Sequence, residues 1–366
     1  MNLYQIAFPT RNKFEGVSTY IYSSKLKLNL GDLVRCPFGK KSLLGLIIAD
    51  KVEPPKFKFK EIEEVVLEHF LTDKNVTLFN WISDYYCSDP GVTLELFCTN
   101  NLISRIINKT DSKWLEKEIE KISKVKSKPI KLNKLNKQQL SAFKEVSSGD
   151  KSSFILHGAT GSGKTEVYLH LAQESIKEKK SVLILVPEIG LTTQNIARFE
   201  ELGVPLITLH SGQTPVARAK SWQLIDNLTK ESKPIIILGP RSAMFSPIHN
   251  LGLTIIDEFH DQSYKQDSAP KYNSVIVGGM LAKLNNSKLI LGSATPNVAD
   301  LYTLQQKGVP ILELDSRSSQ TKDISLIDSR NKDLFGRSKI ISTELVEAIK
   351  VALNNLEQVM IFHNRR

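Results

Sequence analysis

The sequence predicts an α/β protein in which a small, β-rich N-terminal domain precedes a lobe built on a parallel sheet with helices on both faces. Short strand signals separated by glycine and proline turns fill about the first hundred residues. From Lys131 onward, near-continuous apolar strands alternate with helical segments. Strands of that kind indicate a parallel sheet, because helices cover both of its faces and leave neither face in water.

We predict four regions along the 366 residues. They are a β-rich domain (1–101), a lysine-rich helical or flexible linker (102–130), the parallel-sheet lobe (131–315), and a connector into the start of a truncated second lobe (316–366). The last region ends on an apolar stretch, 359–362, that is typical of a buried strand. A buried strand needs neighbours, so we expect the chain to be an N-terminal portion, or to receive the rest of that lobe from elsewhere.

The first region should form a small barrel or sheet closed by a helix. Glycine, proline and asparagine mark turns at 29–32 and 37–40. Around them the sequence predicts three strands and one helix, at 20–22, 33–36, 43–49 and 78–86 respectively.

Strands and helices alternate through the lobe. Helices are expected over 135–146, from Lys164, from Leu191 and around Trp222. The predicted strands are 154–156, 182–186, 206–209, 235–238, 253–256 and 288–291. Right-handed crossovers then place the carboxyl ends of these strands, and the loops after them, along one edge of the sheet.

Beyond Ala299 the pattern weakens. We expect a strand over 323–327 and a helix over 342–353. Ser342 is a suitable N-cap for that helix, and Glu344 in the first turn suits the helix dipole.

A glycine-rich loop joins the strand at 154–156 to the helix that begins at Lys164. It has the phosphate-loop pattern G-x-x-x-x-G-K-[ST] between a strand and a helix. The glycines let backbone N–H groups point at a phosphate, and the helix N-terminus adds partial positive charge. We expect Lys164 to contact the β- and γ-phosphates of ATP and the Thr165 hydroxyl to bind Mg²⁺. The predicted nucleotide-binding residues of the loop are Gly158, Ala159, Thr160, Gly161, Ser162, Gly163, Lys164 and Thr165.

An acidic pair at the end of the strand 253–256 is a second nucleotide signal. It matches a Walker B pattern, in which Asp257 holds Mg²⁺, usually through water, and Glu258 polarises the attacking water. With Lys164, these two residues are the predicted catalytic groups. Acidic pairs after strands often only cap the next helix, but the phosphate loop upstream favours the nucleotide interpretation. Gln139 is our candidate for contacting an adenine edge, since its amide both donates and accepts.

Polar residues follow two further apolar strands. Thr192 comes after 182–186, and Arg241 and Ser242 come after 235–238. With backbone N–H groups at the ensuing helix starts, they could bind the phosphates of a single strand without distinguishing its bases. The alternative is that both segments are ordinary strand-to-helix turns.

The segment Gly292–Pro296 follows the strand 288–291. Its hydroxyl groups could link the γ-phosphate to movements of a neighbouring domain. The alternative is a turn that only starts a helix at Asn297.

The composition favours a nucleic-acid partner. Lys and Arg outnumber Asp and Glu by 49 to 39, which gives a net charge of +10 and a pI near 9.2. Cys36, Cys87 and Cys98 form no C-x-x-C pair, so we expect neither a zinc site nor a disulfide framework in this chain. We see no apolar run of membrane-spanning length and no signal peptide, so we expect a cytoplasmic protein without a membrane partner.

These segments, in this order, resemble superfamily 2 helicases and, more narrowly, the bacterial replication-restart helicase family PriA (primosomal protein N′). The resemblance covers nearly the whole chain. In the lobe it rests on Gly158–Tyr168, Val186–Thr192, Leu209–Gly212, Arg241–Phe245, Asp257–Asp261, Ser263–Gln266, Gly292–Pro296 and Phe362–Arg366. In the first region, Gly31–Gly39 and Asp84–Tyr86 are similar to the family's 3′-end DNA-binding domain.

The resemblance implies a RecA-like P-loop lobe and an ATP-dependent 3′→5′ DNA helicase that recognises stalled forks and helps load the replicative helicase. The implied partners are forked and single-stranded DNA with 3′ ends, primosome proteins and the single-stranded-DNA-binding protein, in the cytoplasm at the nucleoid. The positions that match the family's 3′-end pocket are Ser18, Thr19, Gly39 and Lys60. Lys271 matches a position on the family's DNA path.

The chain departs from the family at several positions. The family has Phe-Asp at Ser18 and Thr19, a glutamate at Phe259 and an arginine at Val275. The family's second motor lobe with its arginine fingers, its zinc region and its C-terminal domain have no counterpart in this sequence. We therefore expect weak nucleotide and DNA binding and little motor activity from this chain alone, and zinc only in the part of the family that it lacks. The alternatives are a DNA-binding module with vestigial ATPase parts, or another superfamily 2 motor such as a restriction-type translocase or an RNA helicase.

Overall fold

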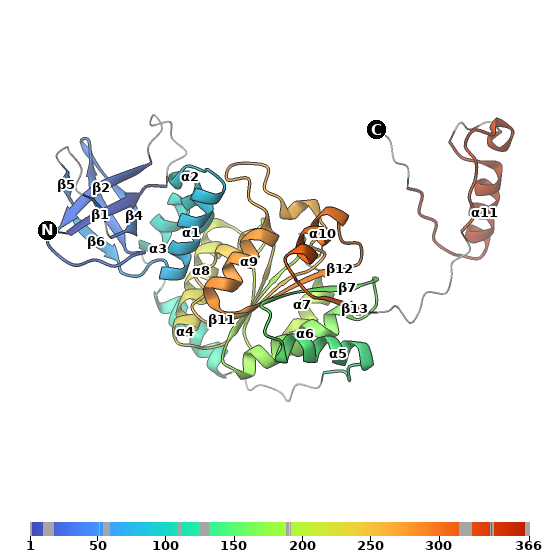
Figure 1. Ribbon diagram of the computed structural model, residues 1–366, viewed down its shortest axis with the longest axis horizontal. Helices are drawn as coiled ribbons and strands as arrows, with labels where there is room; N and C mark the ends of the chain where they lie inside the picture. The colour runs from blue at the N-terminus through green and yellow to red at the C-terminus, as the bar shows by residue number, and fades with distance from the viewer. Residues whose placement is uncertain are drawn as a thin grey trace. The chain divides into compact units, whose positions relative to one another are not determined.

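The computed structural model describes residues 2–9, 18–50, 52–53, 59–107, 112–124, 132–187, 190, 192–314, 324–336, 338 and 340–362. The chain divides into two compact units, Met1–Ser316 and Arg317–Arg366. The β-rich part and the parallel-sheet lobe both lie in the first unit (Figure 1). The predicted fold class is therefore confirmed.

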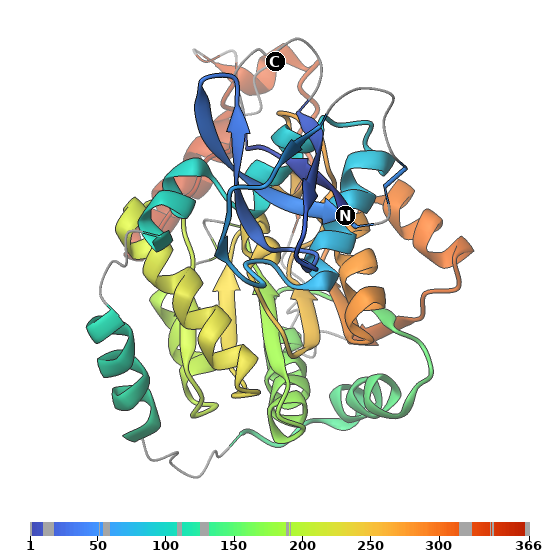
Figure 2. The same cartoon turned by 90° about the vertical axis from the view of Figure 1, so that its left-hand side faces the viewer.

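The N-terminal part contains a six-stranded sheet with the order β5-β2-β1-β4-β3-β6, drawn in blue in Figure 2. Its strands are β1 (Asn2–Ala7), β2 (Thr19–Ser24), β3 (Leu33–Phe38), β4 (Lys41–Ala49), β5 (Lys60–Glu61) and β6 (Glu64–Leu67). Alternate side chains enter a core that includes Tyr4, Ile6, Phe8, Tyr22 and Val34. The three predicted strands are confirmed as β2, β3 and β4. The pattern does not indicate β1, β5 or β6, and β5 is only 2 residues long.

Four helices connect this sheet to the lobe: α1 (Asp73–Tyr85), α2 (Pro90–Phe97), α3 (Asn100–Ile107) and α4 (Ser112–Lys124). α1 begins earlier than the predicted helix because Thr72 caps it, its hydroxyl accepting from Asn75 N at 3.0 Å. α4 and most of α3 lie in the segment predicted as a linker. Both contact α8 of the lobe, and α3 buries Leu102, Ile103 and Ile106 against the core.

The lobe contains a seven-stranded parallel sheet with the order β13-β7-β12-β11-β8-β10-β9. Its strands are β7 (Ser153–Gly158), β8 (Ser181–Leu185), β9 (Leu206–Thr208), β10 (Ile236–Gly239), β11 (Leu251–Ile256), β12 (Lys288–Ser293) and β13 (Ile311–Leu314). Each strand predicted in the lobe is confirmed. β13 is an additional edge strand beside β7 that the sequence pattern does not indicate.

Helices cover both faces of the lobe sheet, as Figure 1 shows. Side chains of α5 (Lys137–Ser148), α6 (Lys164–Lys177) and α7 (Thr193–Glu200) share one core with Phe154 and Ile184. Side chains of α8 (Pro215–Lys230) and α9 (Ser274–Asn285) share the other core with Ile155 and Leu183. Successive strand residues thus face opposite cores, which explains why the strands are apolar throughout. The remaining helix, α10 (Val298–Gln306), follows its N-cap Asn297.

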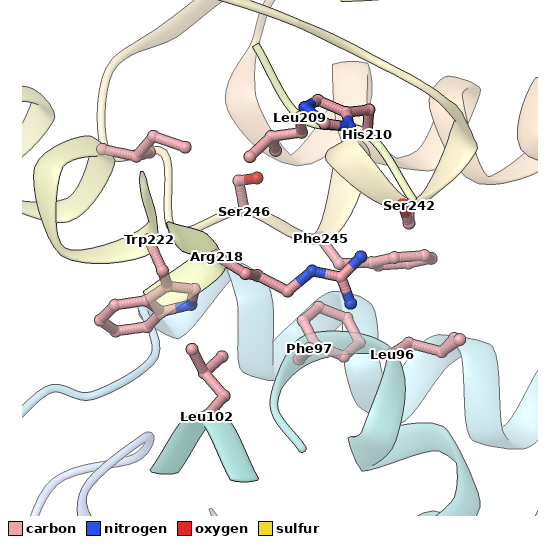
Figure 3. A pocket seen from close by; sticks show the side chains of 11 residues that line it. Leu96, Phe97, Leu102, Leu209, His210, Arg218, Trp222, Ser242, Phe245 and Ser246 are labelled. Carbon is pink, nitrogen blue, oxygen red and sulfur yellow. The ribbon is translucent and has the colours of Figure 1, made fainter. Parts of the chain in front are cut away.

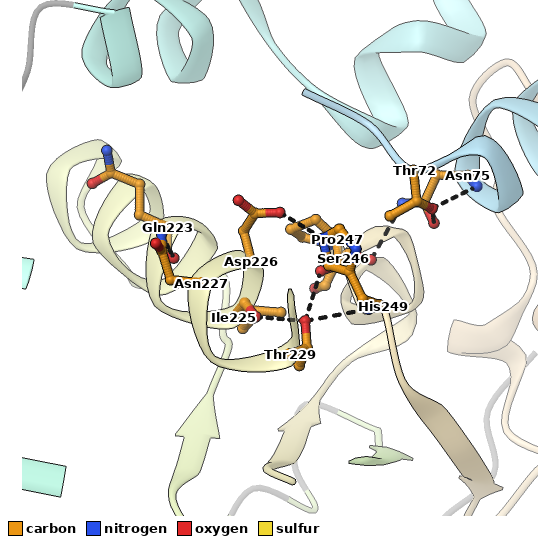
Figure 4. A network of polar contacts seen from close by, with 10 residues as sticks. All are labelled: Thr72, Asn75, Gln223, Ile225, Asp226, Asn227, Thr229, Ser246, Pro247 and His249. Carbon is orange, nitrogen blue, oxygen red and sulfur yellow. Dashed lines mark hydrogen bonds and ion pairs between the residues drawn. The ribbon is translucent and has the colours of Figure 1, made fainter. Parts of the chain in front are cut away.

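A polar network ties α1 to the lobe (Figure 4). Asn75 Nδ2 in α1 donates to Ser246 O at 3.3 Å. The turn that contains Ser246 is also held by Thr229 of α8. The Thr229 hydroxyl lies 3.3 Å from Pro247 O and accepts a hydrogen bond from His249 N at 3.2 Å. The His249 ring adds a contact of 2.8 Å to Asp226 in α8. The turn therefore has partners in both parts of the unit.

Aromatic rings strengthen the same junction. Phe70 stacks on Trp222 with ring centroids 4.8 Å apart, and Phe97 meets Phe245 edge to face at 5.0 Å. Aromatic pairs with this geometry contribute beyond the area that they bury. The N-terminal helices and the lobe therefore share one continuous core, which includes Phe70, Phe97 and Phe245.

The cysteines are free thiols, and they differ in exposure. Cys36 and Cys98 are buried, whereas Cys87 is exposed at the end of α1. Burial raises the pKa of Cys36 to about 12 and also raises that of Cys98. Since the thiolate is the reactive form, the two buried thiols should be inert at neutral pH.

The second unit contains the 3₁₀ helix η4 (Lys332–Phe335) and the helix α11 (Thr343–Asn354). The predicted N-cap is confirmed, since Ser342 Oγ accepts from Leu345 N at 3.1 Å. The predicted strands are wrong where the structure describes them: 324–327 and 359–362 form no strand, and Phe362 is 85% exposed. This unit shows no partner strand in its described residues, and an unpaired strand leaves its backbone groups unbonded. Residue 323 lies outside the described residues.

In the described parts of both units, no helix is long and apolar enough to cross a membrane.

Replacing Phe97 with alanine should lower the free energy of unfolding by about 3–5 kcal/mol, because a large ring is removed from a packed core. The side chain is only 3% exposed. Urea denaturation followed by tryptophan fluorescence would measure the change. The control Tyr302→Ala removes a ring that is 63% exposed and should change stability by less than about 0.5 kcal/mol. Equal effects of the two substitutions would contradict the shared core.

Candidate nucleotide site and nucleic-acid groove

The phosphate loop connects the end of β7 to the start of α6. Gly161 and Gly163 have φ angles of +82° and +89°, which side chains rarely tolerate. A Cβ atom at Gly163 would also lie 2.1 Å from Gln139 Nε2. Backbone conformation therefore favours glycine at both positions, and the approach of Gln139 from α5 also requires it at Gly163.

Lys164 joins the loop to the acidic strand end. Its side chain is nearly buried, and Nζ donates to Gly158 O at 2.7 Å. The same nitrogen lies 3.6 Å from Glu258 Oε1, beyond the end of β11. The structure thus brings together Lys164 and Glu258, two of the three predicted catalytic residues.

Asp257, the third, is held by two tyrosines. Tyr168 Oη donates to Asp257 Oδ1 at 2.9 Å, and Tyr264 Oη donates to the Asp257 carbonyl at 2.6 Å. Burial raises the pKa of the Asp257 carboxyl; the Tyr168 hydrogen bond opposes this, while the charge of Glu258 adds to it. Burial also raises the pKa of Tyr168, so its phenol keeps the proton that it donates.

The acidic pair is connected to the segment after β12. Glu258 adopts φ +47° and its Oε2 accepts from Ala294 N at 3.3 Å. His260 Nδ1 lies 2.7 Å from Ser293 Oγ and 3.5 Å from Glu258 Oε2. The predicted neighbourhood of Gly292–Pro296 and the nucleotide site is thus present in the structure, whereas its role in transmitting movement stays a prediction.

The residues present fit a magnesium–nucleotide complex. Ser162 Oγ is buried and has no hydrogen-bond partner among the described residues, while the space beside Gly161 is open. No group of three or more acidic, histidine or cysteine side chains in the described ranges could hold a metal unaided. Mg²⁺ commonly binds through one or two protein oxygens together with substrate phosphates. Thr165 and Asp257 offer that kind of partial ligand set, and they stay predicted ligands.

Gln139 is the residue through which α5 meets the loop. Its Nε2 donates to Ser162 O at 3.2 Å, and its Oε1 accepts from Asn136 N at 2.9 Å as part of a capping box. Both ends of the amide are therefore engaged within the chain. The residue supports the phosphate loop, and its predicted contact with adenine stays a prediction.

Two of the predicted nucleic-acid residues of the lobe meet in one groove. Arg241 and Ser242 line a cavity of about 580 Å³ beside the carboxyl edge of the sheet. Arg241 Nη1 donates to the carbonyls of Ser263 and Lys265, the latter at 2.7 Å. Thr192 and Lys271 are not among the described residues that line this cavity.

Thr192 and Lys271 have local backbone roles. The Thr192 carbonyl accepts from Ile196 N at 3.1 Å at the start of α7. The Lys271 carbonyl accepts from Lys265 Nζ at 2.6 Å. Contact of either residue with DNA stays a prediction.

The predicted 3′-end residues lie at the ends of strands in the N-terminal sheet. The buried Ser18 hydroxyl accepts from Gly91 N at 2.7 Å and is thus committed to the start of α2. Thr19 begins β2 and its hydroxyl accepts from Gln5 Nε2 at 3.2 Å. Gly39 lies in the β3–β4 turn at φ +58°, and Lys60 is paired with Tyr22.

Aromatic rings lie between these positions. Phe38, next to Gly39, is 5.2 Å from the ring of Tyr20, and Tyr20 follows Thr19 directly. Phe8 contacts both rings at 6.0 Å. The predicted residues thus border one aromatic cluster, which suits a terminal base, although binding there stays a prediction.

Tyr168 and Tyr264 are the site residues whose roles the sequence analysis did not assign. Tyr168 is one turn after Lys164 on α6, so the spacing of 4 would have placed both on one helix face. Tyr264 has no such signal, because its contacts with Leu185 and Asp257 depend on how the loop after β11 folds back.

The fold and the site define the class of protein. The DEAD/DEAH box helicase family matches residues 136–304, and the PriA 3′DNA-binding domain (3′BD) matches residues 5–98. The chain therefore combines a helicase lobe with a PriA-type N-terminal domain.

Whole-chain relatives then specify the family. Replication restart protein PriA of Rickettsia felis is 32% identical over all of this chain and 54% of that protein. The protein of the same name from Helicobacter pylori strain J99 is 31% identical over 98% of this chain and 52% of that protein. The chain is similar to the N-terminal part of these PriA proteins and spans about half their length.

Among solved structures, the Hef helicase domain from Pyrococcus furiosus is 16% identical, covers 59% of this chain and 52% of that chain, and has a TM-score of 0.38.

Replacing Gly292 with alanine should disturb the Asp257 site. The new Cβ would lie 1.6 Å from Tyr168 Oη and 3.0 Å from Asp257 Oδ1, so we expect a loss of about 1–3 kcal/mol in the free energy of unfolding. Adding Tyr168→Phe removes the closest atom and should recover part of that loss. The control Gly279→Ala meets open space in α9 and should be neutral or slightly stabilising. Chemical denaturation measures the free energy of unfolding of each variant. An unchanged value for Gly292→Ala would contradict the close approach of Tyr168 to Gly292.

Proposed function

We propose that this chain supplies the ATP-binding lobe and the 3′-end-binding domain of a 3′→5′ DNA helicase that restarts replication at stalled forks. The observation that supports this most is the meeting of Lys164, Asp257 and Glu258 at one sheet edge, in a chain whose whole length matches PriA. The proposed boundaries are 1–101 for the DNA-binding domain and 131–315 for the lobe.

The proposed roles follow from position and charge. Lys164 would move from Gly158 O and Glu258 to the β- and γ-phosphates, and Ser162 Oγ would gain a partner there. Thr165 and Asp257 would hold Mg²⁺, which supplies charge neutralisation at the phosphates when it is bound. Glu258, positioned by Ala294 N, would orient the attacking water.

The contact of His260 with Ser293 supports a proposed role of the segment after β12 in coupling the nucleotide site to movement. If Glu258 turns toward a bound nucleotide, Ala294 N loses its hydrogen bond to Glu258 Oε2, and the segment after β12 is released from the site. We propose that primosome proteins and the single-stranded-DNA-binding protein are partners, at the nucleoid in the cytoplasm, as in the PriA family.

The variant Lys164→Ala should weaken binding of a fluorescent ATP analogue by more than about tenfold, because charge-assisted bonds to phosphate are lost. Binding of single-stranded DNA should stay within about twofold, since no DNA contact is assigned to Lys164. Lys177→Ala, an exposed lysine on the same helix, is the matched control and should leave both affinities unchanged. If Lys164→Ala reduced both affinities equally, the assigned roles would be wrong.

The chain should prefer an oligonucleotide with a 3′-hydroxyl over the same strand with a 3′-phosphate. The aromatic cluster beside Gly39 and Lys60 would receive the terminal base, and an added phosphate would crowd it. Fluorescence anisotropy with the two oligonucleotides measures the preference. Lys60→Ala should reduce it, whereas the exposed Lys27→Ala should not. Equal affinity for both ends in the unsubstituted chain would contradict a 3′-end pocket.

A further inference from the structure

We propose that the cavity between α2, α3 and α8 is a subsite for one phosphodiester group of a single DNA strand, with Arg218 as its cationic ligand and the Trp222 N–H as a second donor. The inference rests on the DNA-binding part of the proposed function. Figure 3 shows the Arg218 side chain extending across the cavity, with Ser242 and Phe245 on one side and Leu96 and Phe97 on the other.

Arg218 is common to three cavities, with volumes of about 80, 580 and 150 Å³. Within the described part of the chain, its guanidinium has no hydrogen bond or ion pair. An arginine presents five donors in a planar fork that matches the oxygens of a phosphate. Arg218 is an exposed residue that lines a partly enclosed site without a protein acceptor, so its guanidinium is available to an anionic ligand.

The other arginine of the groove is engaged. Arg241 donates to the carbonyls of Ser263 and Lys265, so it holds the loop after β11. From the sequence alone, Arg241 is the phosphate ligand that the strand-end pattern indicates. The contacts make Arg218 the better candidate, since none of its donors is used by the described residues.

Trp222 provides an independent observation. Its side chain is 9% exposed, and Nε1 is buried without an acceptor among the described residues. An indole nitrogen can only donate, and a buried donor without an acceptor is unfavourable. In Figure 3 the indole nitrogen lies on the edge of the ring nearest Arg218. Two donors without acceptors therefore line one cavity.

The size and walls of the cavity indicate a phosphate of a strand. About 80 Å³ accommodates a phosphate group but not a nucleotide, and the adjoining 580 Å³ leaves room for the neighbouring sugar and base. Glu95 and Asp261 line the larger cavity and not the smaller one, so the anion belongs beside Trp222. Phe97 and Phe245, both buried, form an apolar wall of the smaller cavity.

The location indicates DNA held between the two matched domains. One wall, α2, lies in the 3′DNA-binding domain at 5–98, and the opposite wall, α8, lies in the helicase domain at 136–304. The loops after β9 and β10, at the carboxyl edge of the sheet, complete the site. A strand bound there would contact both domains at once.

The experiment measures the anisotropy of a labelled oligothymidylate of about twelve nucleotides over a series of salt concentrations. A 3′-phosphate on the oligonucleotide keeps the 3′-end pocket out of the measurement. Arg218→Ala should weaken binding about tenfold at low salt and reduce the slope of log K against log salt by about 0.7, the value for one phosphate contact to a single strand. Arg218→Lys should keep most of the slope, because it keeps the charge. The control Lys230→Ala, an exposed residue on the same helix, should keep affinity and slope.

Tryptophan fluorescence tests the second donor. DNA should change the emission of the unsubstituted chain and of Trp114→Phe but not of Trp222→Phe, which retains a ring for Phe70 to stack on. An unchanged slope in Arg218→Ala, while the unsubstituted chain binds DNA, would overturn the subsite and leave the proposed function standing. If inorganic phosphate alone quenched Trp222 fluorescence, the ligand of the cavity would be a free anion and not a DNA strand, and the subsite proposal would be wrong. Absence of any DNA binding by the unsubstituted chain would overturn both proposals.

Discussion

The closeness of Tyr168 to Asp257 across β12 is the constraint on which the nucleotide site depends. β12 lies between β7, which leads into the phosphate loop, and β11, which ends at the acidic pair. At Gly292 it has no side chain, and a single added carbon would collide with the Tyr168 hydroxyl. One helix, α6, can therefore position both the loop lysine, Lys164, and the carboxylate of Asp257, because β12 leaves a gap between them at Gly292.

The same closeness determines the electrostatics. An aspartate this buried would favour its neutral form, and the phenol of Tyr168 counteracts that by donating to the carboxylate. Tyr264 does not bond the carboxylate; it bonds the backbone carbonyls at the ends of β8 and β11 and so fixes the position of the strand ends. The two tyrosines thus hold the Asp257 side chain and the adjoining strand ends in fixed positions.

Much of this could be predicted from the sequence. Apolar strands, glycine spacing and the acidic pair are local signals, and each lobe strand that they indicate is present. The sequence did not indicate contacts between residues far apart in the chain. Examples are the hydrogen bonds of Arg241 to the Ser263 carbonyl, of Gln139 to the phosphate loop, and of Tyr264 to the ends of two strands. The strand predicted at 359–362 failed for a related reason, since apolar composition indicates burial only where a partner exists.

The exposed thiol of Cys87 has a practical consequence. It directly follows Tyr86, whose hydroxyl accepts from Asn273 N at 3.1 Å, in the stretch between the acidic strand and α9. Because the other two thiols are buried and poorly ionised at neutral pH, a maleimide dye would attach at this one place without any engineering. Its emission would report on the contact between the end of α1 and the segment before α9 in the native sequence.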